Sequence, residues 1–396
     1  MKNVYASVKA VGVDVHYRFS TVTMRDAGGK VVRRERLEHG DRRALRGKLS
    51  RWAKEAPIVM EASFGWAWLA DLMVELGLDP QLANCYKLEQ MRKARGLAKT
   101  NKKDGDLLSL LPSEREQWWR VWMSPPEVRD RREWMRYRSS LVRIQTATKN
   151  RLSALLHRHG ILHEFSDLFG VQGRQFLAEL WRDGGTQQAP LPAGARRALG
   201  GLLELLAQVR GQLARVAQEL RGQLERSEEA RRLDGVPGIG LILAHTLLAE
   251  VGQIERFGNH RALASYSLLG PIARDSGEED GDSPLGRHLG HRGNHTLQWA
   301  FLEAAHGAVR RGGKWRRWFD SVTEGGTRDR NRGYIKVARE LVKVVYVVWS
   351  KRVDYTDNPP PRQGRAPQSP RQRMKKFLSS TRSGTGQPCR PMAVVR

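Results

Sequence analysis

Two short apolar runs that each stop at an acid constrain the fold of this chain most tightly. One reads VGVD and ends at Asp14, and the other reads PIVME and ends at Glu61. Around them, strand patterns alternate with amphipathic helical patterns, which is typical of an α/β or mixed-sheet domain. We expect strands over 11–24, 57–62 and 79–85, a hairpin partner over 28–37, and helices over 41–55 and 64–77.

A carboxylate at the end of an apolar strand costs free energy unless a donor or a cation compensates its charge. If the two runs are neighbouring strands, Asp14 and Glu61 emerge near the same end of the sheet. Downstream, the stretch AKTNKKDGDLLSLL puts Asn101 and Asp104 one helical turn apart. Hard oxygen ligands grouped in this way suit Mg²⁺, and two such ions suit phosphodiester cleavage. Any one of these acids alone is more often structural or solvated.

The charge balance indicates a polyanionic partner, most simply nucleic acid. The 396 residues include 69 Lys and Arg against 42 Asp and Glu, so the formal net charge is +27. We expect no membrane partner, because no apolar run approaches the ~20 residues of a spanning helix. The first residues lack the apolar core of a secretory signal. Cys85 and Cys389 give neither a disulfide framework nor a CxxC spacing, which fits the cytoplasm.

Two long helices with apolar stripes follow the α/β region. They pair either with each other in one chain or between two chains. The first stripe, within 126–160, contains Trp134, Tyr137, Leu141, Ile144, Leu152 and Leu155; the second contains Leu202, Leu206, Val209, Leu213, Val216, Leu220 and Leu224. The other faces of the first helix are basic and face either solvent or phosphate. The bases are Arg131, Arg132, Arg136, Arg138, Arg143, Lys149, Arg151 and Arg158.

Further motifs lie on either side of these helices. Three tryptophans cluster in EQWWRVWM. Packing in a core is the more common role of such residues, and stacking on nucleic-acid bases is the more specific functional alternative. The stretch LDGVPGIG with the apolar run after it is similar to a helix-hairpin-helix, whose turn at Gly238 and Gly240 presents N–H groups to DNA phosphate. A tight turn in a helical core is the alternative. A polar loop over 275–294 holds two candidate nucleophiles, Ser276 and Ser283.

In this order, the motifs resemble one family of insertion-sequence transposases, the family usually numbered one-ten. The resemblance covers about residues 8 to 350 and is carried by GVDVH, VMEASFGW, AKTNKKDGDLLSL, LDGVPGIG, RALASYSLLGPIARDSG and GHRGNHTLQWAFLEAA. It implies an α/β RNase H- or RuvC-like N-terminal domain with a DEDD set of acids, a coiled-coil middle and a mostly α C-terminal serine domain. We place these domains at 1–125, 126–228 and 229–354, with a disordered basic tail over 355–396.

The resemblance also implies a role for single residues. The four acids fall on Asp14, Glu61, Asn101 and Asp104, so an asparagine, which ligates without adding charge, stands in the third place. Asp106 is a candidate to compensate, at the wrong spacing. The family's serine falls on Ser276, with Ser283 as an alternative alignment, and implies a covalent phosphoserine formed with the help of Mg²⁺.

The implied partners are donor and target DNA, a structured noncoding (bridge) RNA, and further copies of the chain in a homodimer or tetramer associated with the bacterial nucleoid. The residues expected to contact nucleic acid are Lys99, Lys102, Lys103, Arg136, Arg143, Lys149, Arg151, Gly238, Gly240, Arg287 and Arg292. Two alternatives stay open. One is a structure-selective nuclease, such as a Holliday-junction resolvase, that activates water with the same acids. The other is an inactivated nucleic-acid-binding copy, which Asn101 favours.

Overall fold

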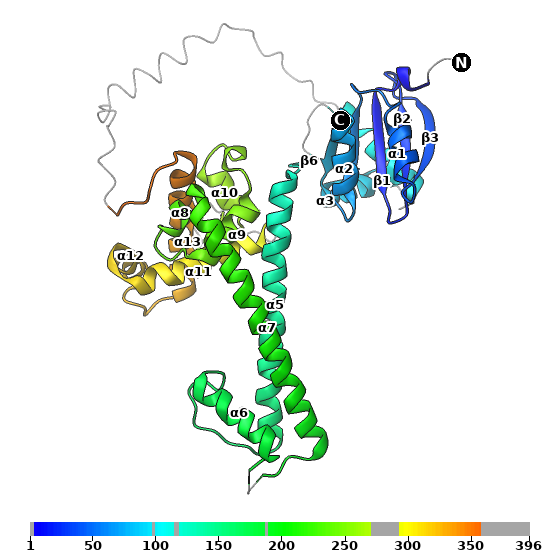
Figure 1. The fold of residues 1–396 in the computed structure, drawn as a ribbon. Helices are drawn as coiled ribbons and strands as arrows, with labels where there is room; N and C mark the ends of the chain where they lie inside the picture. The colour runs from blue at the N-terminus through cyan, green and yellow to red at the C-terminus, as the bar shows by residue number, and fades with distance from the viewer. Residues whose placement is uncertain (1–3, 97–99, 115–118, 187–188, 271–292, 358–396) are drawn as a thin grey trace, which may run out of the picture. The chain divides into compact units, whose positions relative to one another are not determined.

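The computed structural model describes residues 4–96, 100–114, 119–186, 189–270 and 293–357 (Figure 1). The chain packs as two compact units. The first contains the residues up to Val216 together with Thr246–Gly252, and the second contains Ala217–His245 and the residues from Gln253 onward. Among the described residues, no helix is long and apolar enough to cross a membrane. The domain limits expected at residues 125, 228 and 354 stay predictions.

The first unit contains a six-stranded mixed sheet in the order β3-β2-β1-β4-β5-β6, which confirms the predicted α/β domain. The central strand β1 pairs antiparallel with β2 and parallel with β4. β3 extends the antiparallel side, while β5 continues the parallel side and the short β6 closes it. The strands are β1 (Ala10–Val15), β2 (Phe19–Arg25), β3 (Val31–Glu38), β4 (Pro57–Glu61), β5 (Asp79–Ala83) and β6 (Arg120–Val121).

The single strand expected over 11–24 is wrong, because this stretch forms two strands joined by a tight turn. The backbone N–H of His16 donates to the carbonyl of Phe19 at 2.9 Å and closes the turn. Between them, Tyr17 is 95% exposed. The turn contains neither Gly nor Pro, so the sequence carries none of the usual turn signals. The expected hairpin partner is present as β3, and it pairs with β2.

Helices cover both faces of the sheet, which explains why β4 is apolar from Pro57 to Met60, up to its final acid. Ile58 and Met60 belong to one core with side chains of α1 and α2, while Val59 belongs to a second core with side chains of α3 and α4. The helices of this part are α1 (Arg42–Leu49), α2 (Trp66–Glu75), α3 (Cys85–Ala94) and α4 (Asn101–Leu108), with short 3-10 turns at Val4–Ser7 and Leu111–Ser113.

Two long helices follow, α5 (Pro126–Arg158) and α7 (Ala193–Arg226), and the shorter α6 (Val171–Asp183) comes between them in the chain and lies to one side of them (Figure 1). The helix expected over 126–160 is confirmed. Leu152 of α5 and Leu206 of α7 share one core, so these parts of the two stripes pack within one chain. The expected stripe of α5 is partly wrong, because Ile144 is 43% exposed whereas Thr148 is buried. A heptad coiled coil and its role in dimerisation stay predictions.

The described part of the second unit is helical, which confirms the expected helical C-terminal region. Its longest helix, α13 (Arg330–Ser350), packs against α10 (His260–Tyr266), α11 (His295–Arg311) and α12 (Gly313–Thr323). The turn of the LDGVPGIG motif lies between α8 (Glu228–Asp234) and α9 (Leu241–Val251), and a 3-10 turn at Ile254–Arg256 follows α9. The tail expected to be disordered lies outside the described residues from position 358 onward.

Candidate active site

Asp14 and Glu61 lie at the same end of the sheet and on the same face. β1 and β4 are parallel neighbours with Val13 opposite Met60, so one further step along the register places Asp14 beside Glu61. Because side chains alternate between faces, both acids share the face of Val59, which α3 and α4 cover. The condition on which the sequence analysis relied, that the two strands are neighbours, is therefore met.

α4 packs on this face at unusually close range, and a glycine in β1 makes the approach possible. A Cβ at Gly12 would lie 2.3 Å from both the carbonyl oxygen of Gly105 and the amide nitrogen of Ser109. Thr100 fixes the start of the helix, since its side chain accepts a hydrogen bond from the backbone of Lys103 at 3.2 Å. The predicted ligands at 101 and 104 therefore occupy the first turn of a helix that rests directly on β1.

α4 runs antiparallel to β1, which brings its first turn to the end of the sheet that carries the acids. Just after the last turn of α4, Ser109 Oγ accepts a 2.8 Å hydrogen bond from the side chain of Arg25. In the sheet, Arg25 is the β2 partner of Ala10, the first residue of β1. One turn earlier, Gly105 lies between Thr23 and Thr21, the β2 partners of Gly12 and Asp14. The four residues before Gly105 add about 6 Å, or roughly two strand residues, in the same direction. The structure thus brings all four predicted ligands to one end of the sheet.

Asp14 and Glu61 each contact another titratable side chain. Asp14 Oδ2 lies 3.2 Å from His16 Nε2, which allows an ion pair when the imidazole is protonated. The Cys85 thiol at the start of α3 donates a hydrogen bond to Glu61. Burial, together with the negative charge and the hydrogen bond of Glu61, raises the pKa of Cys85 to about 11. The thiol is therefore neutral near pH 7 and does not add negative charge beside Glu61.

The donors at this end suit a hard divalent cation, because carboxylate and amide oxygens are the ligands that Mg²⁺ prefers. Asp14, Glu61 and Asp104 are all partly exposed, so an ion from solvent can reach them. In the described part of the chain, no three His, Cys, Asp or Glu side chains are grouped closely enough to hold a metal. Asp14, Glu61 and Asp104 are therefore not gathered as a closed ligand set in this structure.

Asp106 does not replace the missing third acid, because it is fully engaged elsewhere. Arg34 of β3 donates to both of its carboxylate oxygens at 2.9 to 3.1 Å, and Thr23 of β2 donates at 3.0 Å. Burial raises the pKa of Asp106, but the hydrogen bonds from Arg34 and Thr23 and the charges of Arg34 and Arg25 outweigh it and hold the pKa below its usual value. Asp106 fastens α4 to the sheet.

Both candidate serines, Ser276 and Ser283, and the expected phosphate contacts Arg287 and Arg292 lie outside the described residues. The described residues that flank this stretch, Gly270 and Gly293, both pack against residues of α10. A Cβ at Gly270 would lie 3.0 Å from the Cα of Ser265, and the backbone N–H next to Gly293, at position 294, donates to the carbonyl of Tyr266. Gly270 and Gly293, the described residues on either side of the serines, thus both lie near the C-terminal end of α10.

Two family models match this chain over the parts just described. A DEDD transposase model matches residues 11–161, and the model of the transposase IS116/IS110/IS902 family matches residues 230–320. The chain belongs to the IS116/IS110/IS902 family of transposases. The first match contains all four predicted metal ligands, and the second contains Gly238, Gly240 and Ser276. The resemblance stated from the sequence motifs is confirmed.

Relatives in three bacteria agree with this family membership. The chain is 22% identical to the transposase for insertion sequence element IS1111A of Coxiella burnetii over 88% of this chain and 91% of that protein. It is 28% identical to an uncharacterized protein of insertion element IS116 of Streptomyces clavuligerus over 44% of this chain and 43% of that protein. It is 30% identical to a probable family 20 transposase of Pseudomonas aeruginosa over 44% of this chain and 49% of that protein.

The basic residues expected to contact nucleic acid have different environments in this transposase. Arg136 lies 3.6 Å from Glu250 of α9, and Lys149 lies over the ring of Phe169, so both have partners within the fold. Arg143 and Arg151 are exposed, as is Lys103 on α4. Lys99 lies outside the described residues, as does the side chain of Lys102. Part of the basic surface of α5 is thus structural, and the exposed residues remain candidates for phosphate contact.

The turn of the LDGVPGIG motif is partly explained by packing. Gly238 has a φ of +83°, and a Cβ there would lie 2.0 Å from the carbonyl oxygen of Ala304 and 2.6 Å from the amide nitrogen of Ala308 in α11. Gly240, in contrast, is exposed with no other atom within 4 Å of a built Cβ. Gly238 therefore serves the helical core, and only Gly240 is left as an accessible position. A DNA-binding helix-hairpin-helix stays a prediction.

Two aromatic side chains that follow the candidate acids closely in the chain were not predicted as functional residues. Phe64 follows Glu61 closely and is 98% exposed, and Tyr17 follows Asp14 closely and is 95% exposed. Large exposed aromatic rings are the usual stacking platforms for unpaired bases. A signal was present in both cases, because an aromatic residue comes three positions after an acid near the end of a strand. The tryptophan cluster behaves in the opposite way, since Trp119 is fully buried in the core, and Trp118 lies outside the described residues.

Proposed function

We propose that this transposase cuts and rejoins DNA strands with a serine nucleophile and a divalent metal ion. The observation that supports the proposal best is the placement of Asp14, Glu61 and the first turn of α4 at one end of the sheet. Mg²⁺ bound there would supply positive charge that stabilises the negative charge growing on a DNA phosphate in the transition state. The ligands would be Asp14, Glu61 and Asp104, with Asn101 as a weaker fourth.

In this proposal, Ser276 is the nucleophile. Its oxygen forms a bond to a DNA phosphorus while one phosphorus–oxygen bond of the strand breaks, so a phosphoserine holds one DNA end. A hydroxyl at another DNA end then displaces the serine and joins the strands. The total number of phosphodiester bonds is conserved, and no external source of energy is needed. The hydroxyl proton must be removed, since the pKa of serine lies far above neutral.

Asn101 weakens the expected binding of metal ions, because the four-ligand set has one negative charge fewer than a set of four acids. A second divalent ion placed near the first then has less charge to offset its repulsion. Asn101→Asp should therefore bind Mn²⁺, used as a probe for Mg²⁺, more tightly than the wild-type chain. If wild type neither cleaves nor joins DNA while Asn101→Asp does, the natural protein is an inactivated copy that still binds nucleic acid.

The metal site can be tested separately from DNA chemistry. We expect Glu61→Gln to weaken Mn²⁺ binding by about tenfold or more, because one charged ligand becomes neutral. The matched control is Glu55→Gln, which makes the same change at an exposed acid just before β4. Calorimetric titration of Mn²⁺ gives the affinities directly. Equal Mn²⁺ affinities for the two variants would rule out Glu61 as a ligand.

The same proposal includes the macromolecular partners. The formal net charge of +27 and the exposed bases on α4 and α5 suit donor and target DNA, and also a structured guide RNA. We propose that the chain acts on nucleic acid as a homodimer or tetramer. A nuclease that activates water instead of serine is distinguished by its product, since it leaves free DNA ends and no protein–DNA bond.

A further inference from the structure

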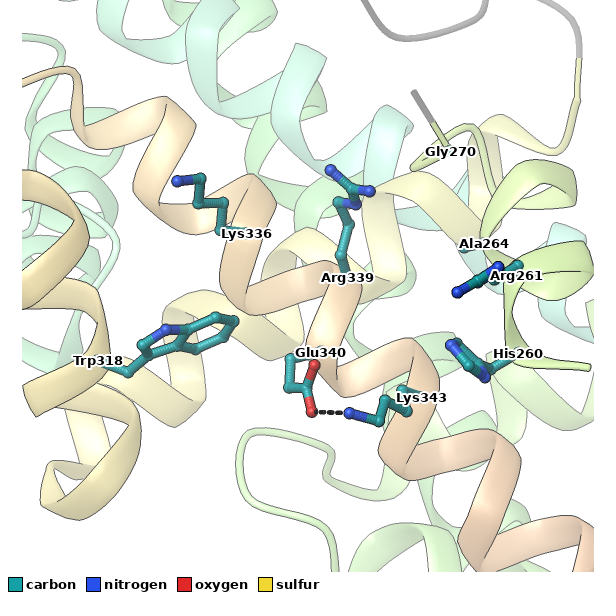
Figure 2. A pocket seen from close by; sticks show the side chains of 9 residues that line it. All are labelled: His260, Arg261, Ala264, Gly270, Trp318, Lys336, Arg339, Glu340 and Lys343. Carbon is teal, nitrogen blue, oxygen red and sulfur yellow. Dashed lines mark hydrogen bonds and ion pairs between the residues drawn. The ribbon is translucent and has the colours of Figure 1, made fainter. Parts of the chain in front are cut away.

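A pocket in the second unit has no place in the chemistry described above. Its volume is about 460 Å³, and it lies where the face of α13 is flanked by α10 on one side and α12 on the other (Figure 2). The size falls in the range of about 300–1,000 Å³ that is usual for sites that enclose one small ligand. A pocket of this size accepts one nucleotide, whereas a double helix needs an extended groove.

The lining of the pocket is strongly basic. Lys336, Arg339 and Lys343 follow one another along one face of α13, and Arg261 of α10 lies across the pocket from them (Figure 2). One acid opposes these four cations, Glu340, and its carboxylate already pairs with Lys343 at 2.8 Å. Among the described residues, no side-chain hydrogen bond or ion pair engages the other three cations. They are therefore available to an anion.

The wall opposite Arg261 is aromatic. Trp318 of α12 is half-buried and lines the pocket from that side (Figure 2). Its indole ring neighbours that of Trp315, with the ring centroids 6.4 Å apart and the planes tilted by 58°. A half-buried indole ring beside a group of cations is the arrangement that single-strand-binding proteins use, in which a base stacks on the ring and the cations hold the backbone. Inorganic phosphate has no base that could stack on the indole ring, so the ring indicates a nucleotide as the ligand.

We propose that this pocket binds one nucleotide of a single-stranded nucleic acid, with its phosphate on Arg261, Lys336 and Arg339 and its base against Trp318. The inference rests on the proposed function in so far as it requires nucleic acid as a partner, but it requires no catalysis. The pocket also lies next to the start of the segment that carries Ser276, because Gly270 lines it. A strand held here would be held by the serine domain itself.

The test is the affinity of the full chain for short fluorescent oligonucleotides, measured by anisotropy in EDTA so that no strand is cut. The double variant Lys336→Gln/Arg339→Gln should bind oligothymidylate at least about tenfold more weakly, with a salt slope smaller by about one. The control Arg317→Gln/Lys351→Gln removes the same charge from exposed positions outside the pocket, and should change the affinity by no more than about twofold.

A second variant tests the aromatic wall. Trp318→Leu should weaken binding of oligothymidylate by about tenfold but leave an abasic strand of the same length unaffected, because that strand has no base to stack. Trp318→Phe, which keeps a ring, should restore most of the affinity. A parallel series with oligouridylate shows whether the natural occupant is DNA or RNA, and a preference for either one agrees with the proposal.

Three results would overturn the pocket while leaving the proposed function intact: equal losses in the pocket and control double variants, equal losses of Trp318→Leu for the normal and abasic strands, or binding of duplex that depends on the pocket as strongly as binding of single strands. If the wild-type chain bound no oligonucleotide at all, the pocket proposal would be wrong, whereas the proposed function is decided separately by the covalent-adduct assay with donor DNA, target DNA and RNA. Circular dichroism shows whether each variant has kept its helices.

Discussion

Gly12→Ala should displace α4 and disable the candidate active site without unfolding the protein. The new Cβ would lie 2.3 Å from two backbone atoms of α4, whereas ordinary contacts begin at about 3.4 Å. Backbone atoms cannot rotate away as a side chain can, so the helix must move by about 1 Å. Overpacking of this kind costs about 1–3 kcal/mol, and a 1 Å displacement of a catalytic group can lower the rate by about 100-fold.

The effect can be measured at two levels. Hydrogen exchange should show faster exchange of the amides of α4, and a strand-cleavage assay should show the loss of rate. The matched control is Gly47→Ala in α1, where a Cβ meets no atom within 4 Å. This control should be neutral, or more stable by about 0.5–1 kcal/mol, because alanine favours a helix interior. If Gly12→Ala matched Gly47→Ala in both exchange and rate, close packing of α4 on β1 would not position the site.

Three further predictions concern other parts of the fold. Gly238→Ala should destabilise the second unit by about 2 kcal/mol or more in urea, because its Cβ would collide with α11, whereas Gly240→Ala should leave stability unchanged; equal midpoints for the two variants would contradict this packing. Asp106→Asn should lower the free energy of unfolding by about 1 kcal/mol at pH 7. Because the pKa of Asp106 is depressed in the folded state, the stability it provides is present above about pH 4 and is lost as the pH falls through the folded-state pKa. The difference in stability between the variant and wild type should therefore shrink in acid. Cys85, with its pKa raised to about 11, should react very slowly with iodoacetamide at pH 8, and Glu61→Gln should speed the reaction; mass spectrometry of the alkylated peptide gives both rates.

The placement of the acids could be predicted from the sequence because it depends on local patterns. An apolar run that stops at an acid identifies a strand end, and strand–helix alternation makes parallel neighbours the expected arrangement. The one condition, that β1 and β4 are adjacent, is met in the structure. The close packing of α4 was not foreseen, although Gly12 in an apolar strand and Gly105 in the facing helix are the residues that permit it.

The errors arise where tertiary contacts decide. The turn after β1 forms from His16, Tyr17 and Arg18, which carry no turn signal, so the sequence pattern predicts one strand where the structure has two. The buried face of α5 shifts from the expected stripe because several elements pack against it, including α9, whose backbone carbonyls at 249 and 250 accept hydrogen bonds from Arg132. The spacing makes Asp106 a candidate ligand, but Arg34, far away in the sequence, donates hydrogen bonds to its carboxylate.

The basic pocket could not be predicted, because three helices that are distant in the sequence build it. Only one part has a local signature: Lys336, Arg339, Glu340 and Lys343 are spaced so that they share one face of α13. That spacing alone is common on solvated helices. The contribution of Arg261 and Trp318 depends on how α10 and α12 pack against α13, which no local pattern specifies.

The central claim is that serine chemistry and the acids at the end of the sheet act together. The most direct measurement is a denaturing gel of full-length protein incubated with Mg²⁺, donor and target DNA, and RNA transcribed from the flanking element. Wild type should give a covalent protein–DNA adduct, Ser276→Ala should give none, and Asp14→Asn should give little, whereas Ser283→Ala should retain it. An adduct that persists in Ser276→Ala, or free cleaved DNA in every lane with no adduct, would contradict the account.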